Sequence, residues 1–257
     1  MRLTRALVRR PSPNFAEGLT RGDYGSPTYA LAKAQHERYC EELERCGLRL
    51  TRLSADAHHP DGTFVEDTAI FTGRGAILTR PGAPSRRGEV ASVREALMEL
   101  APSLGEIEAP GCVDGGDVCE VNGRFLIGIS ERTDEEGARQ LAAILSSHGH
   151  DSATLDLRGV PGLLHLKSGL TALDDGRVVA IAALADRDEL RGHAMIRVAD
   201  GESYAANCVC VNGRVLIARG FPLLEGALVK LRYDVVTLEM SEFRKMDGGL
   251  SCLSLRL

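Results

Sequence analysis

The chain has 257 residues, of which 44% are hydrophobic and 26% charged, a composition typical of a globular protein. It excludes collagen-like, coiled-coil and intrinsically disordered chains. The 31 lysines and arginines against 36 aspartates and glutamates give a net charge of −5, which offers no basic field to nucleic acid or anionic lipid. We therefore expect neither nucleic acid nor membrane as a partner, and the acidic balance weakly favours a cationic substrate.

Seven cysteines in a chain of this length, without the apolar N-terminal run of a secretion signal, predict a reducing compartment. We expect a cytoplasmic protein. The longest apolar run, residues 178–185, has eight residues, far fewer than the ~20 that span a bilayer.

Four turns with Gly-Arg separate pairs of β-rich runs, at 72–74, 122–124, 175–177 and 212–214. Asn-Gly and Asp-Gly between such runs predict hairpins, because the central residues need positive φ. Chance is the alternative, since Asn-Gly is the dipeptide that hairpins ordinarily use. The segments after the hairpins also recur, and this recurrence favours a true repeat.

The other predicted elements are taken in chain order. Residues 27–46 form a helix that Gly47 ends, and a second helix has an apolar face of Val90, Val93, Leu97 and Leu100. A capping box at 133–136 opens a third helix, with an apolar face of Ala138, Leu141 and Leu145 and a stop at Gly149. The remaining predictions are a strand at 153–157, a short weak helix after Asp186, a helix at 223–231 and a strand at 235–238.

The repeating unit is therefore two strands of a hairpin, a helix and a third strand. The helices argue against an all-β propeller. Units of this kind, packed around a pseudo-symmetry axis, would meet in a central channel with their loops at its mouth. No linker or change in composition marks a boundary, so we expect residues 1–257 to form a single α/β domain.

Two residues far apart in the sequence are candidates for nucleophilic chemistry. Cys252 follows Gly248 and Gly249, which permit a sharp turn, although a free cysteine is more often a small buried hydrophobe. His165 interrupts an apolar run and can equally be a satisfied core histidine. Together they can form a nucleophile and a general acid/base.

Acidic residues cluster at 61–67 and at 114–117. The second cluster, Asp-Gly-Gly-Asp, is typical of a turn. In the first, Glu66 and Asp67 interrupt a β-like apolar run, so at least one of them points inward and needs a partner or a cationic ligand.

Arg86 and Arg132 occupy equivalent places in two repeats, where a hairpin strand leads to a helix. Such a place suits an anion, because the helix N-terminus offers free N–H groups and arginine adds a bidentate fork. Either residue alone can also be a solvated surface arginine. We predict no metal site, since His58-His59 lacks a second ligand pair and Cys208-x-Cys210 lacks zinc spacing.

Seven stretches occur in a fixed order over nearly the whole chain, and Arg-Pro-Gly-Ala-Pro-Ser-Arg-Arg at 80–87 is the most specific of them. They are residues 63–67, 79–87, 114–117, 129–133, 164–168, 206–208 and 247–252. Together they resemble the dimethylarginine dimethylaminohydrolases, guanidine-modifying enzymes of the pentein superfamily. The resemblance implies a five-bladed α/β propeller with its active site in the central channel, and neither metal nor cofactor.

The same resemblance implies the roles of the site residues. Cys252 would be the nucleophile, His165 the general acid/base and Asp114 the carboxylate that orients the histidine; some bacterial members have glutamate at this last position. The others would bind the substrate, a small methylarginine. They are Asp67 with Glu66 beside it for the guanidinium, Asp61 with main chain near Leu19 and Met246 for the α-amino group, and Arg86 and Arg132 for the α-carboxylate.

Arginine and agmatine deiminases typically carry an aspartate two residues after the catalytic histidine, where this chain has Lys167. The resemblance therefore favours hydrolysis of methylated arginines to citrulline over arginine deimination. Another guanidine hydrolase or an amidinotransferase is the alternative enzyme, and a non-catalytic binder on the same fold is the alternative of a different class. Relatives of this size include dimers, which leaves a homodimer and a monomer both open.

Overall fold

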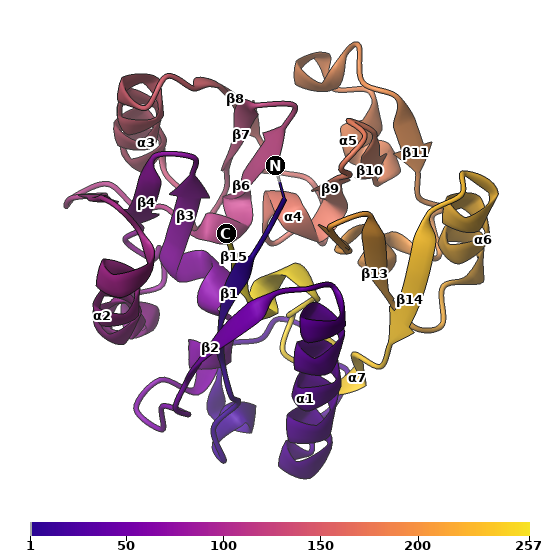
Figure 1. Cartoon of the computed structure of the whole chain (residues 1–257), viewed down its shortest axis with the longest axis horizontal. Helices are drawn as coiled ribbons and strands as arrows, with labels where there is room; N and C mark the ends of the chain where they lie inside the picture. The colour runs from indigo at the N-terminus through magenta and orange to yellow at the C-terminus, as the bar shows by residue number, and fades with distance from the viewer. Residues whose placement is uncertain (1) are drawn as a thin grey trace.

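The computed structural model describes residues 2–257, and five three-stranded sheets form a ring about a central axis (Figure 1). In every sheet the first strand runs antiparallel to the middle strand and the middle strand runs parallel to the third. A helix connects the middle strand to the third strand. The fold is a five-bladed α/β propeller of repeated ββαβ units, as predicted.

Two of the blades follow each other directly after β2 in the sequence. One consists of β3 (Ala69–Thr72), β4 (Gly75–Leu78), α2 (Val90–Leu100) and β5 (Leu104–Glu106). The next consists of β6 (Val118–Val121), β7 (Arg124–Ile129), α3 (Glu135–Ser147) and β8 (Asp151–Asp156).

Two further blades complete the middle and the C-terminal part of the chain. One consists of β9 (Leu170–Ala172), β10 (Val178–Ala180), α5 (Ala182–Ala185) and β11 (Met195–Arg197). The other consists of β12 (Val209–Val211), β13 (Arg214–Ala218), α6 (Pro222–Lys230) and β14 (Asp234–Leu238).

The fifth blade joins the two ends of the chain. It consists of β15 (Leu255–Arg256), β1 (Arg5–Arg9), α1 (Tyr29–Arg45) and β2 (Arg49–Leu53). β15 pairs with β1, so the last strand closes the ring against the first, and both termini lie near its centre (Figure 1).

The hairpins form where the Gly-Arg turns predict them. In the β6–β7 turn Asn122 and Gly123 have φ values of 51° and 82°, and in the β12–β13 turn Asn212 and Gly213 have 51° and 89°. Positive φ at both central residues is the requirement of a two-residue hairpin turn.

The helix predictions are confirmed in outline and corrected in detail. α3 begins one residue later than a cap at Thr133 implies, because the carboxylate of Asp134 accepts the N–H of Gly137 at 2.7 Å. The prediction of a weak helix after Asp186 is wrong in its position. Its single turn, α5, lies before that residue, because the alanine-rich end of the apolar run at 178–185 favours helix over strand.

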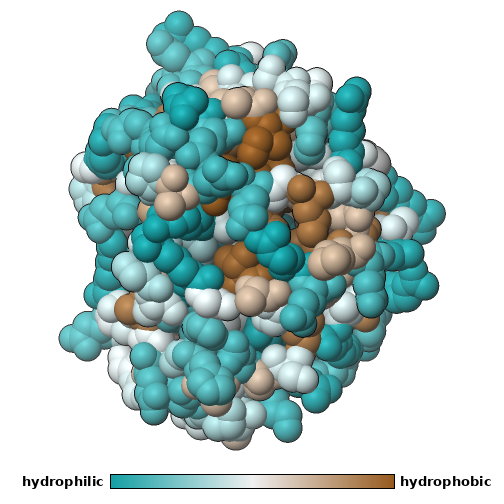
Figure 2. All heavy atoms as spheres, turned by 90° about the vertical axis from the view of Figure 1, so that its left-hand side faces the viewer, coloured by the Kyte–Doolittle hydropathy of each residue, from teal (hydrophilic) through white to brown (hydrophobic). Residues whose placement is uncertain are grey.

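The apolar core is divided among the blades, where helices pack on sheets. α3 buries Ala138, Leu141 and Leu145, the face that its sequence predicts. Full burial of one leucine side chain contributes about 2 kcal/mol. The side of the molecule that carries α2 and α3 is mainly hydrophilic, with apolar side chains gathered in small patches (Figure 2). Within residues 2–257, no helix combines the length and apolarity that crossing a membrane takes.

A short helical turn precedes the first strand of every blade. The five turns are η3 (Val65–Thr68), η5 (Gly115–Asp117), α4 (Leu166–Gly169), η7 (Ser203–Ala206) and η8 (Ser251–Leu253). η3 contacts η5 and η8, and α4 contacts η5 and η7. Segments that are far apart in the sequence therefore meet around the axis.

Candidate active site

Residues of two of these helical turns, η3 and η8, line one cavity together with residues of neighbouring loops and turns. Eight of the ten predicted site residues are in its lining, and the other two, Asp114 and Glu66, are outside it. The lining consists of Leu19, Asp61, Phe64, Asp67, Arg86, Arg132, Leu164, His165, Met246, Asp247, Gly248 and Cys252. The tertiary structure thus brings the sulfur of Cys252 and the imidazole of His165 to the same cavity.

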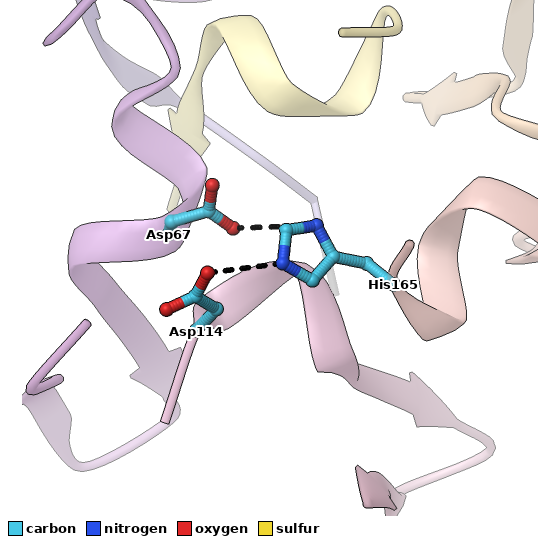
Figure 3. A group of neighbouring side chains, drawn as sticks. All are labelled: Asp67, Asp114 and His165. Carbon is cyan, nitrogen blue, oxygen red and sulfur yellow. Dashed lines mark hydrogen bonds and ion pairs between the residues drawn. The ribbon is translucent and has the colours of Figure 1, made fainter. Parts of the chain in front are cut away.

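His165 is the N-cap residue of α4, and its ring lies between two carboxylates (Figure 3). Its Nε2 atom is 3.0 Å from Oδ2 of Asp114, and its Nδ1 atom is 4.0 Å from Oδ1 of Asp67. Burial disfavours the imidazolium, but Asp67, Asp117 and Asp114 outweigh burial and raise the pKa of His165 to about 9. The ring is therefore cationic at neutral pH.

Asp114 has the geometry of an orienting carboxylate. It is fully buried, and its second oxygen, Oδ1, accepts the N–H of Gly82 at 2.9 Å. A side chain on Gly82 would bring a Cβ within 2.3 Å of the Arg132 carbonyl oxygen, so this approach requires glycine. The close approach of the Gly82 and Arg132 backbones places the Gly82 N–H where it holds Asp114 within reach of His165.

Asp67 is a buried, ionised carboxylate. Its Oδ2 atom accepts a hydrogen bond from Arg86, and its Oδ1 atom accepts the N–H of Gly116 at 2.9 Å. Burial opposes ionisation, but the charges of His165 and Arg86 lower the pKa of Asp67 to about 2. Asp67 therefore presents a negative charge to the cavity.

The two predicted carboxylate-binding arginines have different surroundings. Arg86 donates to Asp67, to both oxygens of Glu89 and to the Phe64 carbonyl, which takes four of its five N–H groups. The guanidinium of Arg132 lines the cavity and makes no hydrogen bond to the residues that the structure describes. Of the two, Arg132 is the one whose donors are available to an anion.

A segment of the N-terminal loop crosses beside the cavity. The N–H of Leu19 donates to both oxygens of Asp61, at 3.0 and 3.1 Å, and the N–H of Arg21 donates to Asp247. Burial raises the pKa of Asp61 despite the charges of Arg86 and Arg132. Asp61, Met246 and Arg132 all line the cavity.

Cys252 lies in η8, after a turn that needs close backbone approach. The positive φ of this turn falls on Asp247, at 56°, and not on the two glycines. A Cβ on Gly248 would lie 2.2 Å from the Phe64 ring, and a Cβ on Gly249 would lie 2.4 Å from the Asn207 side chain. Burial, together with Glu66 and Asp67, raises the pKa of the Cys252 thiol to about 12.

Glu66 lines a second cavity together with Lys167, Ser251 and Arg256. Its carboxylate accepts hydrogen bonds from Lys167 Nζ at 2.8 Å, Ser251 Oγ at 2.5 Å and Arg256 Nη2 at 3.4 Å. Asn207 also donates to the Ser251 hydroxyl at 3.0 Å. The structure therefore links Glu66 to the residue before Cys252, while its two oxygens are already occupied by protein donors.

Asp67, Asp114 and His165 are the one group among residues 2–257 with donor atoms close enough to hold a metal, all within 4.8 Å of one another. Asp67 is already bound to Arg86 and Gly116, and Asp114 to Gly82. These partners satisfy the oxygens without an ion.

A sequence model of the arginine deiminase family matches residues 58–207. A curated N(G),N(G)-dimethylarginine dimethylaminohydrolase from Pseudomonas aeruginosa is 42% identical over 251 residues, which cover 97% of this chain and 98% of that protein. The chain belongs to the dimethylarginine dimethylaminohydrolase family. A second member, from Streptomyces coelicolor, is 36% identical over 98% of the chain and 96% of its own length.

The fold of this family member agrees with a solved structure of the P. aeruginosa enzyme, a Cys-to-Ser mutant complexed with citrulline. The two chains match over their full lengths with a TM-score of 0.97 and 40% sequence identity. The five-bladed ring and its closure by the chain ends are thus features of the dimethylarginine dimethylaminohydrolase fold.

Sequence reasoning missed several residues that build the site of this family member. The Asp-Gly-Gly-Asp pattern predicts an ordinary turn at Asp117, yet its carboxylate is fully buried and hydrogen-bonded. Glu89 pairs with Arg86 three residues earlier, a spacing that was visible in the sequence. Asn207 and Ser251 carried no signal of their meeting, because only the tertiary fold joins their segments.

Proposed function

We propose that the protein hydrolyses Nω-methylated arginines, namely asymmetric dimethylarginine and monomethylarginine, to citrulline and dimethylamine or methylamine. The observation that carries the proposal is the shared cavity of Cys252 and His165, with Asp61 and Asp67 in the same lining. The P. aeruginosa relative has this activity in its name. The segments that line this cavity come from all parts of the chain, so we treat residues 1–257 as one catalytic domain.

The charges of the cavity suit an amino acid with a cationic side chain. Asp67 binds the guanidinium at one end. Arg132 binds the α-carboxylate at the other end, whereas Arg86 donates to Asp67 and so holds the guanidinium-binding carboxylate in place. Asp61, with main chain near Leu19 and Met246, accepts the α-amino group. Each charged part of the substrate thus has a partner of opposite charge.

Binding of the substrate activates the nucleophile. With a pKa of about 12, the Cys252 thiol is neutral in the free enzyme at neutral pH. A bound guanidinium supplies the positive charge that offsets Asp67 and Glu66, and so it favours the thiolate. The thiolate attacks the central carbon of the guanidinium and forms a tetrahedral adduct.

His165 supplies and then accepts the protons. As an imidazolium it protonates the leaving dimethylamine or methylamine, whose C–N bond breaks to give an S-alkylthiouronium. Neutral His165 then takes a proton from water, which adds to the thiouronium carbon. Cleavage of the C–S bond releases citrulline and restores the Cys252 sulfur. The 3.0 Å contact with Asp114 supports an orienting role for that carboxylate.

The surroundings of Lys167 favour a methylated substrate. Lys167 stands two residues after His165 and pairs with Glu66. No aspartate is therefore available at this position to bind the far guanidinium nitrogens. Arginine offers five N–H donors from its guanidinium, whereas asymmetric dimethylarginine offers three. Asp67 already accepts one hydrogen bond on each oxygen, from Arg86 and from Gly116, and the lone pair that remains on each oxygen suits the smaller number of donors. Glu66 takes part by holding Ser251, the neighbour of the nucleophile.

Incubation of the purified protein with asymmetric dimethylarginine, monomethylarginine and arginine, scored for citrulline, tests the proposal. We expect citrulline from the two methylated substrates. Equal turnover of arginine would favour an arginine deiminase. Absence of citrulline from all three would contradict hydrolysis and favour an amidinotransferase or a binding protein.

The proposal includes a cytoplasmic location and leaves a homodimer as the assembly to test. All seven cysteines are free, which supports a reducing compartment. Fractionation of the source cells checks the location, and sedimentation of the purified protein checks the dimer.

A further inference from the structure

Asp117 is a buried carboxylate that the proposed reaction does not use. It is fully buried at the end of η5 and accepts three hydrogen bonds. Two reach its Oδ2 atom, from the hydroxyls of Ser130 at 2.6 Å and Thr133 at 2.7 Å. The third reaches its Oδ1 atom, from the N–H of Leu166 at 3.0 Å. A buried carboxylate with this many protein donors holds its neighbours in fixed positions.

The two hydroxyl donors belong to the turn that carries Arg132. The Ser130 hydroxyl in turn accepts the N–H of Arg132 at 2.9 Å and the N–H of Thr133 at 3.2 Å. The Ser130 N–H also donates to the Thr133 carbonyl at 3.0 Å and closes the turn. Through these hydrogen bonds, Asp117 holds the backbone turn that carries the Arg132 side chain.

The third donor belongs to the peptide that comes after His165. Because the N–H of Leu166 is part of the peptide bond formed by the His165 carbonyl, its contact with Asp117 fixes the backbone next to the imidazole. The Thr133 hydroxyl, which donates to Asp117, also accepts the N–H of Asp114 at 3.1 Å. One carboxylate thus joins the segments of Arg132, His165 and Asp114.

We propose that Asp117 is a positioning residue that sets the distance between the guanidinium of Arg132 and the imidazole of His165, and thereby matches the cavity to the length of one arginine side chain. This inference rests on the proposed function. The substrate's carboxylate binds at Arg132 while its guanidinium reacts beside His165, so the spacing of the two decides which chain length reacts. A misplacement of 1 Å can cost about 100-fold in rate.

Asp117 also contributes charge to the site. Burial raises the pKa of Asp117 to about 6, against the opposing effects of His165, Ser130 and Thr133, so it is ionised at pH 8. The charges of Asp67, Asp114 and Asp117 all act on the imidazole of His165 and favour its cationic form. The remaining titratable and charged groups of the cavity lining are Asp61, Arg86, Arg132, Asp247 and Cys252.

Two substrates that differ by one methylene test the inference. They are asymmetric dimethylarginine and its homologue with one more methylene in the side chain. The variant Ser130→Ala cuts the link to the Arg132 turn and keeps the Asp117 charge. We expect kcat/KM for asymmetric dimethylarginine to fall about 10-fold and the preference over the homologue to fall at least about fivefold. Ser103→Ala, at an exposed serine of another blade, is the matched control and should change neither.

A double-mutant cycle separates positioning from general loss of stability. In the background of Arg132→Ala the carboxylate grip is already lost, so Ser130→Ala should lower kcat/KM by less than about twofold. A merely structural role would lower activity by the same factor in both backgrounds. Thermal unfolding of each variant checks that it is folded.

The isosteric variant Asp117→Asn gives a second readout. We expect the basic limb of its kcat profile to move to lower pH, because His165 loses one of the charges that favour imidazolium. If the wild-type protein makes no citrulline, the proposed function itself is overturned. If the wild type is active but Ser130→Ala keeps the chain-length preference and Asp117→Asn keeps the pH profile, only the positioning role is overturned.

Discussion

Asp114 binds the Nε2 atom of His165 at 3.0 Å and leaves Nδ1, which lies 4.0 Å from Oδ1 of Asp67, without a hydrogen bond to the described residues. In the proposed reaction, Nδ1 is therefore the nitrogen that exchanges a proton with the substrate. The same arrangement surrounds the ring with carboxylates and keeps it protonated, which is the form that the first half of the proposed reaction requires.

Replacement of the orienting carboxylate tests this arrangement. Asp114→Asn removes a charge and a hydrogen-bond acceptor from His165, so we expect kcat to fall by about 100-fold or more. The basic limb of the kcat profile should also move to lower pH. Steady-state rates between pH 5 and 10 measure both effects, and an unchanged profile would contradict the orienting role.

The raised pKa of His165 predicts a pH-dependent stability. The pKa rises from 6.5 in the unfolded chain to about 9 in the folded protein, so the stabilisation is fully present below pH 6.5 and is lost as the pH rises through 9. The shift corresponds to roughly 3 kcal/mol. Urea unfolding at pH 6 and pH 9.5 should show this loss in the wild type and not in His165→Gln. Equal losses in both proteins would sink the prediction.

The neutral Cys252 thiol predicts slow alkylation of the free enzyme. With a pKa of about 12, its reaction with iodoacetamide should keep accelerating up to pH 10 without a plateau. Mass spectrometry of the peptide that contains Cys252 measures this rate separately from those of the other cysteines. A plateau near pH 8 would mean that the thiolate forms without substrate.

Removal of the Cys252 sulfur should separate binding from chemistry. We expect Cys252→Ser to lower citrulline formation by about 1,000-fold or more, because the serine hydroxyl is a much weaker nucleophile at neutral pH. Calorimetric titration with asymmetric dimethylarginine should still show binding, and thermal unfolding should match the wild type. Turnover close to the wild-type rate would exclude Cys252 as the nucleophile.

The two arginines should respond differently to substitution. Arg132→Ala removes donors that bind no other described residue, so we expect KM to rise about 10- to 100-fold with little change in kcat. Arg86→Ala leaves Asp67 and Glu89 buried without their partner and should also lower stability by about 3 kcal/mol or more. Steady-state kinetics and urea unfolding distinguish the two. A fall in kcat alone for Arg132→Ala would contradict its binding role.

Gly116 is a position where a single methyl group should inactivate the site. A Cβ there would lie 2.8 Å from both Oδ1 of Asp67 and Nδ1 of His165. Gly116→Ala must therefore shift one of them, and we expect kcat to fall about 100-fold. Gly123→Ala serves as a control for the loss of a glycine, because no atom lies within 4 Å of its added Cβ, although its φ of 82° lowers stability. Citrulline assays of both variants make the comparison.

Local patterns predicted much of the fold. Asn122-Gly123 and Asn212-Gly213 specify hairpins, since few other residues tolerate positive φ at both positions. The spacing of Ala138, Leu141 and Leu145 marks the buried face of α3. Local patterns do not define every boundary: the apolar residues 178–185 divide between β10 and α5, and hydrophobicity alone does not separate a buried strand from a helical turn.

The sequence by itself determined the repeating unit and, through its family motifs, which side chains are candidates for the site. It did not contain the distances between them. Ring closure by β15 and β1 brings Cys252 to the cavity of His165, and contacts between the helical turns set the networks of Asp117 and Glu66. These interactions join residues dozens to hundreds of positions apart. Local propensity acts over a few residues, so only packing around the common axis decides such contacts.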